Sequence, residues 1–185
     1  MDKKEWLILN FTLPKEQSRV RVSVWRKLKK SGAVNIGQSM WVLPNEKNYL
    51  ETFNEISGEI TQNNGSAYIT NADFVENESS DNIIAVFNNI RDDEYREFMD
   101  KCDDYFLEIE KETKKENFTF AELEENKEEY DKLAEWLKKI SKRDFFGAPL
   151  KKQSEEALQK CKQLLNGFAD KVYQANDTGD FGRDK

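Results

Sequence analysis

The sequence of 185 residues contains no histidine. Without an imidazole side chain, the protein cannot form a Ser-His or Cys-His nucleophile pair, a histidine-based zinc site, or the usual general base near neutral pH. Carboxylate chemistry with Mg²⁺ and lysine-based chemistry remain open. We therefore expect no catalytic residues, no metal and no cofactor, and a protein that is not an enzyme.

Cysteines and long apolar runs are also scarce. The two cysteines, Cys102 and Cys161, are far apart and form no CxxC pair. Each falls on an apolar helical stripe, which favours packing, although a redox role is open if a thiolate is exposed and activated. The apolar run at the start is too short and too quickly charged for a signal peptide, and no stretch approaches the roughly 18 apolar residues of a membrane span. We expect a cytoplasmic protein that does not contact a membrane.

The net charge of −7 is unevenly distributed along the chain. Residues 1–72 carry +3, residues 73–131 carry −14, and residues 132–185 carry +4. An acidic total therefore does not exclude a nucleic-acid partner, because the local potential decides within a Debye length of about 8–10 Å.

The first half of the sequence alternates between strand and helix patterns. Residues 6–13 form an apolar run ended by Pro14, which predicts a buried strand. A helix is expected from Ser18, as its N-cap, to about residue 30, stopped by Gly32. Residues 33–43 predict a second strand.

A second helix is expected to begin at Asn45, and residues 66–70 predict a third strand after the Asn64-Gly65 turn. Residues 73–82 read as an acidic loop, and the short apolar run 83–87 as a fourth strand. The predicted fold class is α+β, a ferredoxin-like βαββαβ-type half-sandwich over residues 1–90.

From residue 91 onward the apolar period is helical. Thr119 to Glu122 match a capping box, and Leu158 to Val172 mark a last helix. We expect an all-helical extension over 91–175 that packs on the first domain, followed by a flexible tail over 176–185.

A basic cluster runs along the first predicted helix and the loop before it, from Lys15 to Lys30. Its members considered for binding are Arg19, Arg21, Arg26, Lys27 and Lys30. Such a set could grip DNA phosphates, and an oxyanion could sit between two arginines. A solvated helix face partly paired with acidic helices explains the same residues.

An acidic stretch follows over residues 92–131, with carboxylates such as Asp93, Glu97 and Asp100 at helical spacing. A solvated face is the simplest interpretation, since metal-bridging bundles also use histidine. The stretch could instead dock a basic protein partner, or fold back on the basic helix and compete with DNA.

The string from Lys142 to Pro149, KRDFFGAP, separates two predicted helices. Its paired phenylalanines predict a structural corner that fills an apolar crevice. Arg143 and Asp144 could equally orient an anion, as a second anion site.

Six segments together resemble a known family: WLILNFTLP, RVRVSVWRKLKKSGAV, SMWVLP, VFNNIRDDEY, FAELEE and RDFFGAP. In this order, over about residues 5–170, they resemble the N-terminal domain of the chromate-resistance regulator ChrB. The resemblance implies a chromate-responsive transcriptional regulator, with DNA as partner, chromate or another oxyanion as effector, and a homodimer. Full-length members carry a second, C-terminal domain, whereas this sequence ends at Lys185, so a separate protein partner replacing that domain is one expectation.

The first 70 residues are also similar to the central domain of the phenylacetate-degradation repressor family. They share the layout of the small CRISPR spacer-acquisition nuclease, in which an Asp at the end of the first strand holds the metal. Here that stretch reads from Leu9 to Leu13, LNFTL, without an acid. The favoured function is a regulator that binds DNA through its basic helix, and the alternatives are a protein-interaction module and a metal-dependent nuclease.

Overall fold

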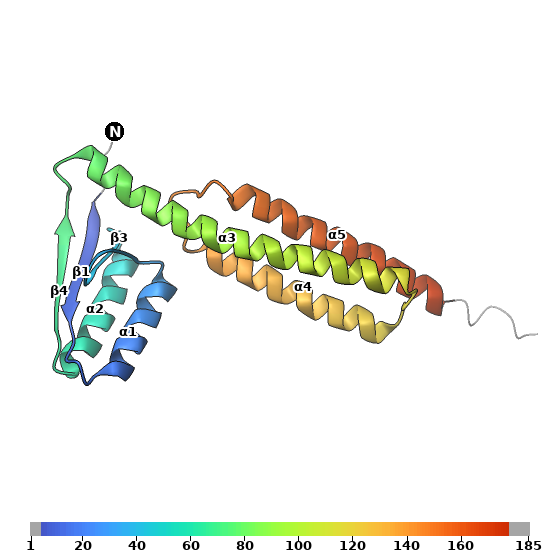
Figure 1. The fold of residues 1–185 in the computed structure, drawn as a ribbon, viewed down its shortest axis with the longest axis horizontal. Coiled ribbons are helices and arrows are strands. Elements are labelled where there is room, and N and C mark those ends of the chain that lie inside the picture. The colour runs from blue at the N-terminus through green and yellow to red at the C-terminus, as the bar shows by residue number, and fades with distance from the viewer. Residues whose placement is uncertain (1–4, 178–185) are drawn as a thin grey trace, which may run out of the picture. The chain divides into compact units, whose positions relative to one another are not determined.

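The computed structural model describes residues 5–177 and is shown in Figure 1. The chain divides into two compact units. The first comprises Met1–Asn89 together with Arg143–Phe146, and the second comprises Ile90–Lys142 together with Gly147–Lys185. None of the described helices is long and apolar enough to cross a membrane.

The first unit is a four-stranded antiparallel sheet with two helices. Its elements are β1 (Trp6–Thr12), α1 (Ser18–Ser31), β2 (Val34–Gly37), β3 (Met40–Pro44), α2 (Lys47–Gln62) and β4 (Ser66–Ala72). The strands lie in the order β2-β3-β1-β4, and every neighbouring pair is antiparallel. The predicted α+β class is confirmed.

The central strand β1 is apolar without interruption from Trp6 to Leu9 because both of its faces are buried. Trp6 to Leu9 are all buried, and alternate side chains leave the strand on opposite sides. Leu7 and Leu9 belong to the core that α1 and α2 complete with Leu28 and Phe53. A strand covered on both faces has no polar side, so its sequence shows no alternation.

The segment 33–43, expected as one strand, is a hairpin instead. The two short strands β2 and β3 pair with each other, with a register irregularity between Asn35 and Gly37. The turn lies at the polar residues Gln38 and Ser39. A single long strand and a hairpin of two short strands have similar apolar patterns. In this segment only the polar pair Gln38 and Ser39 distinguishes the hairpin from the single strand.

The strand predicted at 83–87 is wrong, because these residues lie inside the helix α3 (Asn77–Lys114). The hairpin already supplies the fourth strand, so the sheet needs no other. Ile83 and Phe87 are four residues apart and both buried, and the same face continues at Arg91 and Tyr95. The helix begins at residue 77, so the acidic loop predicted at 73–82 is confined to its first few residues. Short apolar runs do not separate strand from helix by period alone.

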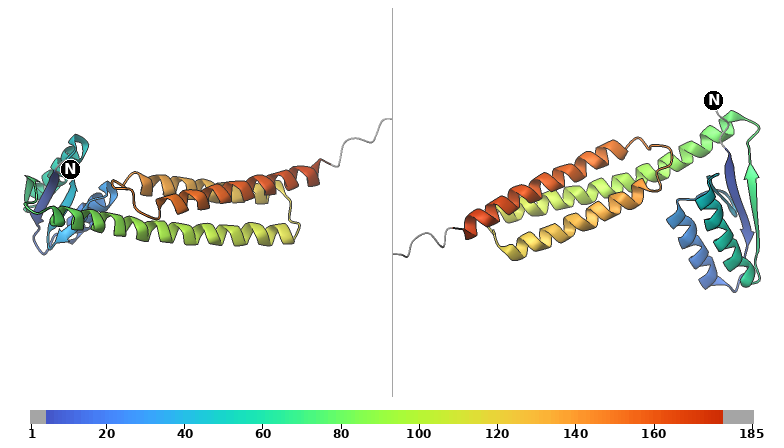
Figure 2. Two further views of the ribbon diagram at one scale, coloured as in Figure 1. Left: turned by 90° about the horizontal axis from the view of Figure 1, so that it is seen from above. Right: turned by 180° about the vertical axis from the view of Figure 1, so that it is seen from behind.

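The second unit is a bundle of three helices, α3 from residue 90 onward, α4 (Phe120–Ser141) and α5 (Lys151–Asn176), which run side by side in the two views of Figure 2. Its core contains Phe98, Tyr105, Leu137 and Phe168. Thr119 is confirmed as the N-cap of α4, since its hydroxyl accepts a hydrogen bond from the Glu122 backbone N–H. The reciprocal half of the predicted capping box is not formed, because the Thr119 backbone N–H donates to the Asn117 carbonyl. The tail predicted at 176–185 begins on the last residue of α5, and residues 178–185 lie outside the described part of the chain.

Candidate nucleic-acid interface

Helix α1 presents one face to the core and the other to solvent. Val24 and Leu28 are fully buried, which fixes the rotation of the helix. The helix ends at Gly32, whose φ of 86° is left-handed and whose N–H donates to the carbonyls of Leu28 and Lys29, as the sequence predicts. The cations at Arg19, Arg26 and Lys30 therefore lie on the exposed side.

Two of the five predicted basic residues are used within the first unit. The Lys27 ammonium lies 2.7 Å from a Glu59 carboxylate oxygen on α2. Hydrogen bonds from Lys27 and then Ser23 lower the pKa of Glu59. The Arg21 guanidinium donates to the carbonyls of Pro14, at 3.0 Å, and Leu13, at 3.4 Å, which ties α1 to the loop that precedes it. These two side chains stabilise the local structure.

The other three cations, Arg19, Arg26 and Lys30, are exposed and make no hydrogen bond or ion pair with the residues that the structure describes. Arg19 and Arg26 line an open hollow of about 500 Å³ together with Val22 and Ser23. Unpaired guanidinium groups at an open surface are available to phosphate or another oxyanion.

Sequence reasoning missed an aromatic side chain on the same surface. Trp25 is 50% exposed and Val22 is 46% exposed, in the middle of the basic residues. The sequence held the signal, because Trp25 falls off the apolar stripe of Val20, Val24 and Leu28. An exposed indole beside guanidinium groups can stack on a base, whereas an ordinary solvated face gains nothing from it.

The corner segment joins the first unit through its aromatic rings. Phe145 packs against Tyr49 and Phe87, and Phe146 against Trp6 and Phe87, with ring centroids between 5.2 and 5.8 Å apart. Arg143 and Asp144 are half-buried beside them. An anion-orienting role for these two residues stays a prediction.

The two cysteines, 59 positions apart in sequence, meet between α3 and α5. Both thiols are fully buried, as their helical stripes predict. A hydrogen bond between them and burial raise the pKa of Cys102, and the same hydrogen bond lowers the pKa of Cys161. In the described part of the chain no cluster of three or more acidic or cysteine side chains could hold a metal ion.

The acidic stretch is mostly a solvated face. Several of its carboxylates pair with a lysine or arginine three or four positions away, among them Asp93 with Arg96, Asp104 with Lys101, and Asp131 with Lys127. Such exposed pairs contribute little to stability, because water and salt screen them.

A four-stranded antiparallel sheet with an exposed basic helix, followed by a three-helix bundle, defines this chain as an α+β protein with a helical second unit. The family model described as "Protein ChrB, N-terminal" matches residues 21–179. The chain belongs to this family, and the resemblance drawn from its six segments is confirmed. No curated protein and no solved structure matches it.

Proposed function

We propose that this chain is a non-enzymatic transcriptional regulator of the chromate or oxyanion response, and that it binds DNA through the outer face of α1. The observation that carries the proposal is the set of cations Arg19, Arg26 and Lys30 on the exposed side of α1, on the same helix as the exposed Trp25. Membership of the ChrB N-terminal family supports the regulatory role.

We further propose that the first unit has the ferredoxin-like topology. The element order βαββαβ and the strand order β2-β3-β1-β4 support it. In this arrangement α1 and α2 share one face of the sheet, and α1 keeps its outer side free for a ligand.

Binding to DNA is tested by fluorescence anisotropy with a labelled duplex from the region upstream of the gene. Phosphate contacts release counterions, so the affinity should fall steeply when the salt concentration is raised. Absent binding, or binding that salt does not change, would refute the proposal.

The effector is proposed to be chromate or a similar tetrahedral oxyanion, held by arginines of α1 or by Arg143. Isothermal titration with chromate and with sulfate, on the wild-type chain and on Arg19→Gln/Arg26→Gln and Arg143→Gln variants, would identify the site. If the heat of chromate binding is the same in the wild type and in all variants, these arginines do not form the oxyanion site.

The proposed lack of enzymatic activity has a direct test against the nuclease alternative. At the end of β1 the chain carries Asn10 and Thr12, where the nuclease layout needs an Asp. Purified protein incubated with single- and double-stranded RNA and DNA, with and without Mg²⁺, should leave every substrate intact. Cleavage that depends on Mg²⁺ would show that the chain is a nuclease and would contradict the proposed lack of enzymatic activity.

A further inference from the structure

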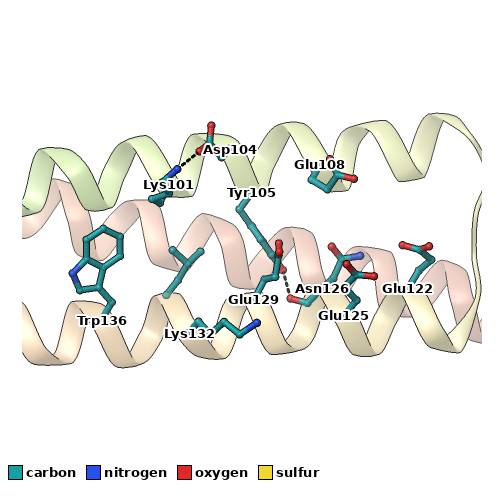
Figure 3. Close-up of a pocket in the computed structure, with 11 residues that line it drawn as sticks. Lys101, Asp104, Tyr105, Glu108, Glu122, Glu125, Asn126, Glu129, Lys132 and Trp136 are labelled. Atoms are coloured by element: carbon teal, nitrogen blue, oxygen red, sulfur yellow. Dashed lines mark hydrogen bonds and ion pairs between the residues drawn. The ribbon is translucent and has the colours of Figure 1, made fainter.

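An acidic groove lies between α3 and α4 of the second unit (Figure 3). It has a volume of about 490 Å³, and no residue of α5 lines it. From α3 it is lined by Lys101, Asp104, Tyr105 and Glu108, and from α4 by Glu122, Glu125, Asn126, Glu129, Lys132, Leu133 and Trp136.

The spacing of these residues is that of a seam for another helix. On α4 they follow one another at steps of three and one from Glu122 to Trp136, and on α3 from Lys101 to Glu108, so each set lies on one side of its helix. Fourteen helical steps extend about 21 Å at 1.5 Å per residue. The groove is therefore long and narrow, which fits about four turns of a helix better than a compact small molecule.

The rim of the groove is negatively charged. Five carboxylates and two lysines line it, and Lys101 already pairs with Asp104 at 2.8 Å. Glu125 and Glu129 are exposed and make no ion pair with any described residue. The rim thus favours a positively charged ligand.

A buried amide among the residues that line the groove lacks a hydrogen-bond acceptor within the described chain. Asn126 is only 3% exposed, and its side-chain nitrogen donates to no acceptor in the described part of the chain. Its backbone carbonyl accepts a hydrogen bond from the Tyr105 hydroxyl at 3.2 Å, which fixes the residue in place. Buried donors are nearly always satisfied, so this amide indicates that an acceptor arrives with a ligand.

We propose that this groove docks helix α1 of a second copy of the chain. α1 has 14 residues, so its length of about 21 Å matches the groove. Its outer face carries Arg19, Val22 and Arg26 at steps of three and four, next to Trp25, so cations would meet Glu125 and Glu129 while apolar side chains meet Leu133 and Trp136. The contact would also cover the two exposed apolar side chains of α1, Val22 and Trp25.

The contact is reciprocal, because each copy has both a helix and a groove. Two copies that exchange α1 in this way form a closed dimer rather than an open chain when the two contacts are related by a twofold axis. This self-association needs only the charges of the chain itself. It competes with the proposed binding of DNA, because both contacts use Arg19 and Arg26 on the outer face of α1.

The experiment uses two charge-reversed forms of the full chain. One carries Glu125→Lys/Glu129→Lys in the groove, and the other carries Arg19→Glu/Arg26→Glu on α1. Sedimentation equilibrium of the wild type should show a dimer that dissociates as salt rises. Each reversed form alone should associate at least roughly tenfold more weakly, because like charges then face each other.

An equimolar mixture of the two reversed forms should restore the dimer. In the mixed pair one contact is wild type and the other has both charges exchanged, so both are again complementary. A Glu124→Lys/Glu128→Lys form changes the same charge on α4 outside the groove and should associate like the wild type. Circular dichroism of all forms confirms folding.

A wild-type chain that stays monomeric at low salt would overturn the proposal. So would a dimer that survives both reversals, or reversed forms that fail to pair when mixed. A loss of association in the Glu124/Glu128 control equal to that of the groove form would also overturn it, by showing a general charge effect.

Discussion

Gly32, at the end of α1, lies directly against the ring of Phe145. A Cβ added at Gly32 would stand 2.9 Å from Cζ of Phe145 and 3.1 Å from Cβ of Arg143. The two residues are 113 positions apart, and their contact ties the corner segment to the end of the basic helix within the first unit. The orientation of α1 therefore depends on a side chain that follows α4.

Gly32→Ala is expected to destabilise the first unit. The φ of 86° disfavours any side chain, and the new methyl group would displace the Phe145 ring. We expect a loss of about 1–3 kcal/mol in the free energy of unfolding, measured by urea denaturation.

Gly58→Ala is the matched control, because an added Cβ meets nothing within 4 Å on helix α2. It should stabilise the chain by up to about 1 kcal/mol through helix propensity. Equal effects of the two alanines would contradict the role given to Phe145.

The sequence and the structure agree best where the apolar period is long. The stripe of α1, the C-cap at Gly32 and the N-cap at Thr119 follow from local rules that involve only residues near in sequence. The strand predicted at 83–87 is wrong, because so short an apolar run suits a strand or a helix equally well. The β2–β3 hairpin completes the four-stranded sheet, and no local pattern at 83–87 shows this. The meeting of Cys102 with Cys161 and of Phe145 with Gly32 depends on tertiary packing, which no local pattern contains.

The candidate site is predictable only in part, because its partners also depend on tertiary packing. The basic residues are visible in the sequence, but their partners are not. That Lys27 is paired with Glu59 and Arg21 with two backbone carbonyls follows only from the position of α2 and of the loop before α1. Trp25 differs from these residues, because its position off the apolar stripe of α1 already indicates an exposed side chain.

The ion pair between Lys27 and Glu59 makes stability depend on pH. The pKa of Glu59 is lowered in the folded chain by the hydrogen bond from Lys27, so the contribution of this carboxylate to stability is present above its unfolded pKa of about 4.5 and is lost as the pH falls through the folded pKa. Because Lys27 is half-exposed, Glu59→Gln should cost only about 0.2–1 kcal/mol at pH 7.

The measurement is urea denaturation of Glu59→Gln and the wild type at neutral and at acid pH. The difference should vanish in acid, where the wild-type carboxylate is protonated. Glu55→Gln, an exposed neighbour on α2, serves as the control and should show no difference at either pH.

Asn126→Leu is expected to leave the isolated chain as stable or more stable. The substitution removes a buried donor without an acceptor, whose burial costs on the order of 1–3 kcal/mol. The hydrogen bond from Tyr105 reaches the backbone carbonyl and is retained.

The measurement is the melting temperature of Asn126→Leu and of the wild type, both in high salt so that the chains are monomeric. A marked fall in the melting temperature would show that Asn126 has a structural role in the free bundle. The unsatisfied Asn126 amide would then no longer support the binding of a partner in the groove.

The central claim is that the exposed cations of α1 bind DNA phosphates, and the salt dependence of affinity tests it most directly. Anisotropy titrations at several salt concentrations give the slope of log K against log salt, which counts the phosphates neutralised. Arg19→Gln/Arg26→Gln should flatten the slope by about 2, whereas Arg96→Gln/Lys152→Gln, with the same loss of charge on the second unit, should leave it unchanged. Equal slopes for all three proteins would contradict the account.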